Sequence, residues 1–456
     1  MRRASNARGR AGEGLKSVRP KVAGVDLGAR EHWVCGPEGE DGSCEVRTFA
    51  TTTAELERLV HWLLEQRVES VAMESTGVYW IPLYELLESN GIEAVLVNAR
   101  HLSGVPGRKT DMIDCQWLQK LHSCGLLKGS FRPDESICRL RALQRERANL
   151  VGERTRIVQR MQKALDQMNV QVHHAVSDLT GTTGLAIVRA IVDGERDPAE
   201  LAKLRDWRCK KSQAQIAAHL RGNWREEHLF NLKMGLRRYD QISLIIAEYD
   251  AQLGHWIAEL EPPDRRGQSA PSHPNATKEK GIRRRGEGNK RDAIWRLAGV
   301  DLTRIDGVSA SAAETVLTEV GLDLGKFPAE RNFVSWLRLS PKLSVSAGKP
   351  LPKRKNGTGA TRVATLLRMA ALAVSRSQTA LGAYYRRIAR HKGAAVAIFA
   401  TARKIAVLVF RMLRYGQDYV DEGVAVYESR FQQRRLRQLT ETARQLGYRL
   451  AALEAA

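Results

Sequence analysis

The 456-residue chain has few cysteines, and they form no pattern. No C-x-x-C pair occurs and no histidines cluster beside the cysteines, which argues against a zinc site and against a disulfide framework. Scattered thiols are typical of a reducing compartment. The six cysteines are Cys35, Cys44, Cys115, Cys124, Cys138 and Cys209.

Long hydrophobic runs are also missing. No stretch approaches the roughly 18 uninterrupted apolar residues of a membrane span, so we expect no membrane association. Residues 1–20 are basic and rich in glycine but lack the apolar core of a signal peptide, which predicts a disordered basic arm and a cytoplasmic protein. The length of the chain predicts two or three domains.

Acidic residues are absent from Arg331 to Gln417, where eighteen Lys and Arg residues occur. The net charge of the whole chain is +22. A solvated surface normally mixes both signs of charge, so this region predicts a surface that binds phosphates, with nucleic acid as the partner. A basic membrane-surface patch is less favoured because the amphipathic pattern with aromatic anchors is missing.

Residues from Lys21 to about Pro133 show an α/β pattern. Three apolar strand-like runs are followed by a helix, a strand, a second helix and a last strand, which is the element order of an RNase H-like sheet. In that architecture the first strand is central and the fourth lies beside it. Because Asp26 and Glu74 end these two strands, we expect their carboxylates side by side. The strands are expected at 22–26, 32–35, 44–49, 70–74 and 92–97.

Two further acids, Asp111 and Asp114, lie three residues apart at a predicted helix start and therefore on one face. Taken singly, these acids have simpler interpretations: Asp26 as a turn residue, the other two as acids favoured at a helix N-terminus. Together with Glu74 they form an oxygen-rich set that suits two Mg²⁺ or Mn²⁺ ions acting on a phosphodiester.

The middle of the chain is predicted to be helical. Apolar residues at near-heptad spacing over 139–168 and 232–260 predict two long helices that pair within one chain or form a dimerising coiled coil. The insert between them, residues 171–231, shows no recognisable chemistry. Residues 263–292 are rich in Gly, Pro, Ser, Lys and Arg, which predicts a basic linker.

Two features follow this stretch. Residues 302–309, with the helix expected over 310–320, look like a helix-hairpin-helix turn that offers backbone N–H groups to a phosphate, although an ordinary helical hairpin looks the same. Ser346 then lies in a glycine-bearing loop among many cations, which would lower the pKa of its hydroxyl and stabilise charge on a phosphate. Most loop serines have no such role, and Ser344 is an alternative nucleophile.

These motifs, taken in order, resemble the DEDD transposases of the insertion-sequence one-ten family from Lys21 to Tyr419. Ala347 stands where the family commonly has glycine, and Thr358 and Thr361 replace its Asn and Leu. The motifs are Gly24-Val25-Asp26-Leu27-Gly28, Met73-Glu74-Ser75-Thr76-Gly77, Lys109-Thr110-Asp111-x-x-Asp114, Ile305-Asp306-Gly307-Val308, Pro341-(x)4-Ser346, Lys355-x-Gly357-(x)4-Arg362, Tyr384-Tyr385 and Ala402-Arg403-Lys404.

The resemblance implies a multidomain α/β plus α protein. Its expected parts are a basic arm (1–20), a RuvC-like DEDD domain (21–135), a coiled coil with a helical insert (136–262), a basic linker (263–292), a mostly helical transposase domain with the serine loop (293–420) and a C-terminal helix (421–456).

The resemblance also implies a site-specific DNA recombinase. Asp26, Glu74, Asp111 and Asp114 would bind metal, and Ser346 would link covalently to DNA in a composite site built by a homodimer or a dimer of dimers. A structured guide RNA would bridge donor and target DNA. The residues expected to bind nucleic acid are Lys109, Lys349, Lys353, Arg354, Lys355, Arg362 and Arg368.

Two other functions stay open at this point. One is a metal-only nuclease of the resolvase kind, in which Ser346 is structural. The other is a nucleic-acid-binding protein without catalytic activity, in which the acidic site has decayed.

Overall fold

A computed structural model describes residues 17–39, 42–75, 77–97, 111–340, 345–346, 349–350, 361–419 and 421–451. The chain divides into two compact units, Met1–Arg132 and Pro133–Ala456. Across the part of the chain that is described, none of the helices has both the length and the apolar character that a membrane crossing requires. The expected basic arm lies outside the described residues up to position 16.

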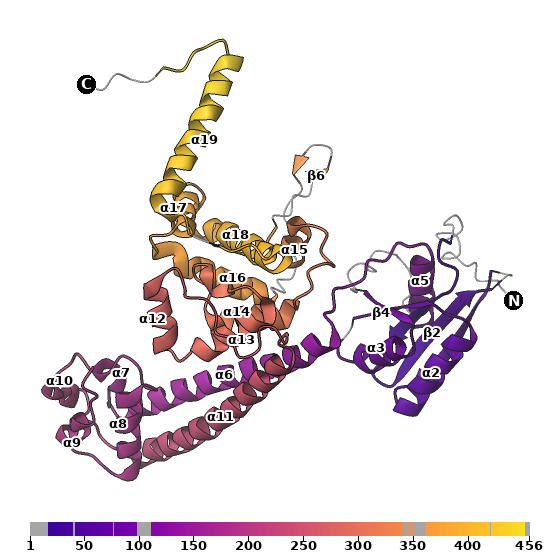
Figure 1. Cartoon of the computed structure of the whole chain (residues 1–456). Helices are drawn as coiled ribbons and strands as arrows, with labels where there is room; N and C mark the ends of the chain where they lie inside the picture. The colour runs from indigo at the N-terminus through magenta and orange to yellow at the C-terminus, as the bar shows by residue number, and fades with distance from the viewer. Residues whose placement is uncertain are drawn as a thin grey trace. The chain divides into compact units, whose positions relative to one another are not determined.

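The first unit is built on a five-stranded sheet with the order β3-β2-β1-β4-β5 (Figure 1). The strand β1 is central, runs antiparallel to β2 and is parallel to β4. This mixed α/β arrangement confirms the predicted strand order and agrees with an RNase H-like domain. The elements are β1 (Val22–Leu27), β2 (Glu31–Glu38), β3 (Cys44–Ala50), α2 (Thr53–Glu65), β4 (Ser70–Glu74), α3 (Trp80–Ser89), β5 (Glu93–Val97) and α5 (Asp111–Ser123).

Helices cover both faces of this sheet. Because side chains alternate along a strand, Val25 and Met73 point to one face, where they pack in a core with residues of α2 and α3. Ala72 points to the other face and packs with Leu118 of α5. Because side chains alternate along each strand, Asp26 and Glu74 also belong to the face that α5 covers.

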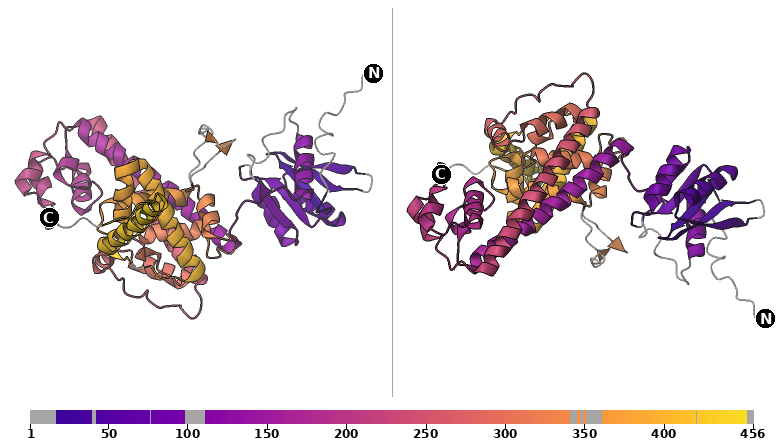
Figure 2. Two further views of the ribbon diagram at one scale, coloured as in Figure 1. Left: turned by 90° about the horizontal axis from the view of Figure 1, so that it is seen from above. Right: turned by 90° about the horizontal axis from the view of Figure 1, so that it is seen from below.

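The second unit begins with a long helical hairpin. The helices α6 (Glu135–Gln167) and α11 (Glu226–Glu259) run antiparallel along each other within the chain (Figures 1 and 2). The guanidinium of Arg147 donates two hydrogen bonds to Asp250, at 2.9 and 2.8 Å. The insert at the far end of the hairpin shares its hydrophobic core. Its helices are α7 (Val172–Ala175), α8 (Thr182–Asp193), α9 (Pro198–Lys203) and α10 (Gln213–Ala218).

Over its described residues, the rest of the second unit contains helices and one short hairpin. The elements are α12 (Ala276–Arg284), α13 (Gly288–Ala298), η1 (Leu302–Arg304), α14 (Ala310–Val320), α15 (Glu330–Trp336), β6 (Val345–Ser346), β7 (Lys349–Pro350), α16 (Arg362–Ala373), η2 (Val374–Arg376), α17 (Ala380–Lys392), α18 (Ala394–Tyr415) and α19 (Gly423–Gln445).

Residues 263–292 differ from the predicted linker, because they contain α12 and the start of α13. Asn275 caps α12 by accepting a hydrogen bond from the backbone N–H of Lys278, and Ile282 is buried. Arg291 is also buried and forms an ion pair of 2.7 Å with Asp301. The charge-rich composition is therefore explained by capped helices with paired charges.

The turn predicted to bind a phosphate packs against the protein instead. Gly307 has a φ of +82°, and a Cβ there would lie 2.5 Å from the carbonyl oxygen of Ala370 in α16. Ile305 and Val308 are buried on either side. Glycine is required at this position because α16 passes so closely, although Gly307 itself is only half-buried.

Candidate active site

The strand register places two of the predicted acids together. β1 pairs with β4 in parallel, with Val25 opposite Met73, so the next residues, Asp26 and Glu74, lie at the same level. Glu74 ends β4, and Asp26 is the residue before the end of β1. Both residues are half-buried. Trp33 stands opposite Asp26 on β2 and shares its face of the sheet. Two carboxylates thus come from adjacent strands to one face, as predicted.

Helix α5 lies directly on this face because β1 carries glycine where the two meet. A Cβ on Gly24 would lie 2.3 Å from the backbone nitrogen of Gln119 and 2.4 Å from the carbonyl oxygen of Cys115. The ammonium of Lys120, 3.1 Å from the carboxylate of Glu38, adds an ion pair between α5 and β2. Glycine inside the strand therefore lets the helix backbone approach the sheet.

The third described acid, Asp114, belongs to α5. Burial is the largest cause that raises the pKa of the neighbouring Cys115 thiol to about 12, and the negative charges of Asp26 and Asp114 contribute to the same shift. The pKa of this one buried thiol is therefore affected by a carboxylate on β1 and by another on α5. Asp111 is the first residue of α5, one helical turn before Asp114, and its side chain lies outside the described part of the structure.

These residues fit a hard divalent cation by their chemistry. Asp26, Glu74 and Asp114 offer only carboxylate oxygens, which are the ligands that Mg²⁺ and Mn²⁺ prefer. Among the side chains that are described, no three His, Cys, Asp or Glu residues lie close enough to hold a metal ion by themselves. Magnesium commonly takes one or two protein carboxylates and completes its shell with water and substrate phosphates, so this set is adequate when a phosphodiester is bound.

The serine loop is described only in part. β6 and β7 form an antiparallel pair in which Ser346 stands opposite Lys349, so the candidate nucleophile lies in a short hairpin (Figure 1). Nothing further is described for the side chains of these two residues. Lys109, Lys353, Arg354 and Lys355, which the sequence predicts to bind nucleic acid, lie outside the described residues.

The two remaining predicted phosphate contacts, Arg362 and Arg368, lie on α16. Arg362 follows the N-cap Thr361, is exposed, and places its Nε 3.9 Å from a carboxylate oxygen of Glu319. Arg368 donates a hydrogen bond of 3.1 Å to Thr365 and stacks over Phe399 at 5.3 Å. Both cations are held in place by protein contacts.

Glu319 is the centre of a larger charge cluster. Its buried carboxylate accepts two hydrogen bonds from Arg145, at 2.8 and 2.7 Å, and lies 3.6 Å from Arg141. With Arg362, three guanidinium groups from α6 and α16 surround one acid of α14. The cluster keeps a positive surplus close to the end of the serine loop.

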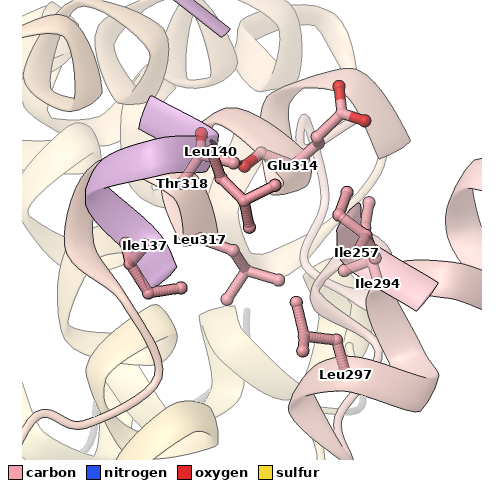
Figure 3. A pocket seen from close by; sticks show the side chains of 8 residues that line it. All are labelled: Ile137, Leu140, Ile257, Ile294, Leu297, Glu314, Leu317 and Thr318. Carbon is pink, nitrogen blue, oxygen red and sulfur yellow. Dashed lines mark hydrogen bonds between the residues drawn. The ribbon is translucent and has the colours of Figure 1, made fainter. Parts of the chain in front are cut away.

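A small pocket in the second unit belongs to the core rather than to a reaction site. It lies where α6, α11, α13 and α14 meet (Figure 3). Its two polar side chains already have partners, because Glu314 forms an ion pair of 2.8 Å with Lys290 and Thr318 donates to the carbonyl of Glu314. The lining residues are Ile137, Leu140, Ile257, Ile294, Leu297, Glu314, Leu317 and Thr318.

Two residues of the acidic site were not predicted from the sequence. Gly24 lies inside an apolar strand, and an isolated glycine at such a position is a known sign of close backbone approach. Trp33 could be placed beside Asp26 only from the antiparallel register, which the sequence does not specify. The four acids themselves were found through their positions at the ends of elements.

Comparison with known proteins agrees with this site. Residues 23–170, which include all four acids, match the IS110 DEDD family described as "Transposase". Residues 299–386, which include Ser346, match the family described as "Transposase IS116/IS110/IS902 family". No curated protein matches the chain. A DEDD transposase domain implies use of a divalent metal in general, and a transposase implies a DNA substrate. The chain therefore belongs to the IS110 family of DEDD transposases and is a DNA transposase or recombinase.

Proposed function

We propose that this protein cuts and joins DNA strands by a metal-dependent reaction in which Ser346 is the nucleophile. The observation that carries the proposal is the parallel register of β1 and β4, which brings Asp26 and Glu74, near the ends of these strands, to the same level. Helix α5 carries Asp114, whose charge reaches the same buried thiol as that of Asp26, and we propose that Asp111 at the start of this helix completes the set. Four acids from two strands and one helix are what a phosphodiester reaction with two Mg²⁺ or Mn²⁺ ions needs.

The acids would hold the metal, and the metal when bound would neutralise charge on the scissile phosphate. In the proposed step the Oγ of Ser346 forms a bond to phosphorus while the bond from phosphorus to a deoxyribose oxygen breaks. The proton lost from Oγ ends on the released deoxyribose hydroxyl, so that the step balances. The product is a phosphodiester between Ser346 and the cut DNA strand. This covalent linkage conserves the energy of the broken DNA phosphodiester for the later step that joins strands.

Cations beside the serine would position the phosphate. Lys349 stands opposite Ser346 in the hairpin, and Arg362 begins the helix that follows the loop. Lys353, Arg354 and Lys355 lie between them in sequence, and Arg368 follows one and a half turns into α16. Such a group stabilises the charge that develops on phosphate oxygens in the transition state.

We further propose that an RNA encoded by the element guides the protein, which acts as a homodimer or dimer of dimers with serine and acids contributed by different subunits. The acid-free region 331–417 supports binding of RNA as well as DNA, since both present phosphates. This step rests on the family resemblance and on charge.

A covalent adduct on a denaturing gel tests the mechanism. Purified protein is incubated with element-end RNA, matching DNA and Mg²⁺, and the wild type is compared with Ser346→Ala, Ser344→Ala and Asp26→Asn. We expect an adduct that is lost in Ser346→Ala and in Asp26→Asn but is kept in the control Ser344→Ala. Asp26→Asn preserves shape and removes only the negative charge.

Other results would favour the alternatives. DNA cleaved without an adduct, and unaffected by Ser346→Ala, would support a metal-only nuclease. DNA bound but never cleaved by the wild type, with no effect of Asp26→Asn, would support a binding protein without catalytic activity.

A further inference from the structure

One tryptophan in the helical insert is almost fully exposed. Trp207, in the loop between α9 and α10, has 84% of its surface accessible, whereas most large apolar residues of the insert are buried in a core. Exposing an indole ring costs free energy that burial would recover, so such a residue commonly marks a binding surface. The acidic site and the serine hairpin give no reason for a tryptophan here.

Hydrogen bonds order the loop that carries this ring. The carboxylate of Asp206 accepts hydrogen bonds from the backbone N–H and the Nε of Arg208, at 2.9 and 2.8 Å. The backbone N–H of Asp206 donates to Thr183 at 2.9 Å, and Arg205 donates to the carbonyl of Lys211 at 3.1 Å. Cys209 packs against the core of the insert. The ring is thus presented by an ordered loop, and binding would cost little conformational entropy.

The charge around the ring selects the kind of ligand. Residues 203–211 contain five Lys or Arg and one acid, Asp206. That acid is already engaged by Arg208, whose hydrogen bonds lower the pKa of Asp206 to about 2. Arg208 also lies 5.9 Å from the ring centroid of Trp207, and Lys210, three residues further along the chain, is exposed. A flat aromatic surface with cations around it suits a nucleobase that carries a phosphate. It suits an apolar peptide, or a peptide with few acids, less well because such a peptide offers no anion to the cations.

We propose that Trp207 stacks on an unpaired base of a single-stranded nucleic acid while Arg208 and Lys210 contact the adjacent phosphates. Bases in a duplex are already stacked on one another, so the site selects single strands, loops or ends. The inference does not depend on the cleavage chemistry, because it concerns binding alone.

The test is fluorescence anisotropy on the full-length chain with the Asp26→Asn change and without metal. The probes are fluorescein-labelled (U)12, (dT)12 and a 12-base-pair DNA duplex, and the RNA and DNA strands show which sugar is preferred. We expect Trp207→Ala to weaken binding of at least one single strand by about 5- to 150-fold, as for the loss of a stacked base, and to leave duplex binding unchanged. Trp207→Phe should keep most of the affinity.

Phe230→Ala is the matched control. Phe230 is also an exposed aromatic residue of the second unit, at 61%, but Glu226 and Glu227 precede it and no cluster of cations surrounds it in sequence. Its loss should leave all three affinities unchanged. A 5-iodouracil version of each single strand should also cross-link under light to the peptide that contains Trp207.

Any one of three results would overturn the proposal. The first is unchanged single-strand affinity in Trp207→Ala, which would leave a protein partner as the ligand of this ring. The second is an equal loss for single strands and duplex. Absence of a cross-link at Trp207, with cross-links formed elsewhere on the chain, would also reject it. The thermal transition of Trp207→Ala should match that of the wild type, because the ring is exposed.

Discussion

The contact between Gly24 and α5 makes the acidic site sensitive to a single methyl group. In Gly24→Ala the new Cβ would lie 2.4 Å from the carbonyl oxygen of Cys115, whereas about 3.4 Å is an ordinary contact. The helix would therefore have to retreat by roughly 1 Å, and overpacking of this kind costs ~1–3 kcal/mol. Because the atoms that clash belong to the helix backbone, no side-chain rotation can relieve the contact.

The retreat would also move two of the four acids away from Asp26. A misplacement of about 1 Å in a catalytic group can cost about 100-fold in rate, so we expect cleavage to fall by about that factor. Unfolding in urea and initial cleavage rates measure the two effects. Gly129→Ala is the control, since a Cβ there meets only a methyl group of Val95 at 3.4 Å. Equal stability and activity in the two variants would refute this account of α5.

Four further predictions follow from the contacts described. Glu319→Gln should lower the free energy of unfolding by about 1–3 kcal/mol, because it removes the buried carboxylate that accepts hydrogen bonds from the partly exposed Arg145 and lies beside Arg141; Glu330→Gln, which breaks the exposed pair with Arg411, should cost under ~1 kcal/mol. Burial, aided by the charge of Arg19, lowers the pKa of His122. Below pH ~6.5 the unfolded chain therefore binds a proton at this residue, whereas the folded chain does not. Stability should therefore fall from pH 6.5 to 5, more steeply in the wild type than in His122→Gln, and a steeper loss in the variant would contradict this cause. Chelation with EDTA should abolish cleavage and leave DNA binding intact in a gel-shift assay. Affinity for duplex DNA should fall with salt with a log–log slope near −5 if the six predicted cations of the serine region contact phosphates; a flat dependence would exclude them.

The sequence predicted the first unit well because its signals were local. Strand boundaries came within a few residues of those in the structure, and the positions of Asp26 and Glu74 at strand ends followed from the run of apolar residues before each. The order of strands then fixed their neighbours, since an RNase H-like sheet pairs its first and fourth strands. Metal binding, the role of Ser346 and the domain boundaries stay predictions.

The parts that were missed depend on how the elements of the second unit pack. Residues 263–292 were predicted as a linker because their composition is polar, yet Arg291 and Asp301 pair in the interior. The pairing of the two long helices within one chain was left open, because heptad spacing is the same for both arrangements. Trp207 gave no signal, since exposure is a property of the folded insert.

The cluster at Glu319 has a mechanical consequence. It holds α6 at Arg141 and Arg145, near the start of a helix that continues for 22 residues from Arg145 to Gln167, or about 33 Å. If α6 rotated by 10° about this contact, its far end would move by about 6 Å. The same acid contacts Arg362, the first residue of α16 after the serine loop. The carboxylate of Glu319 therefore links α6 to the start of the helix that follows the serine loop.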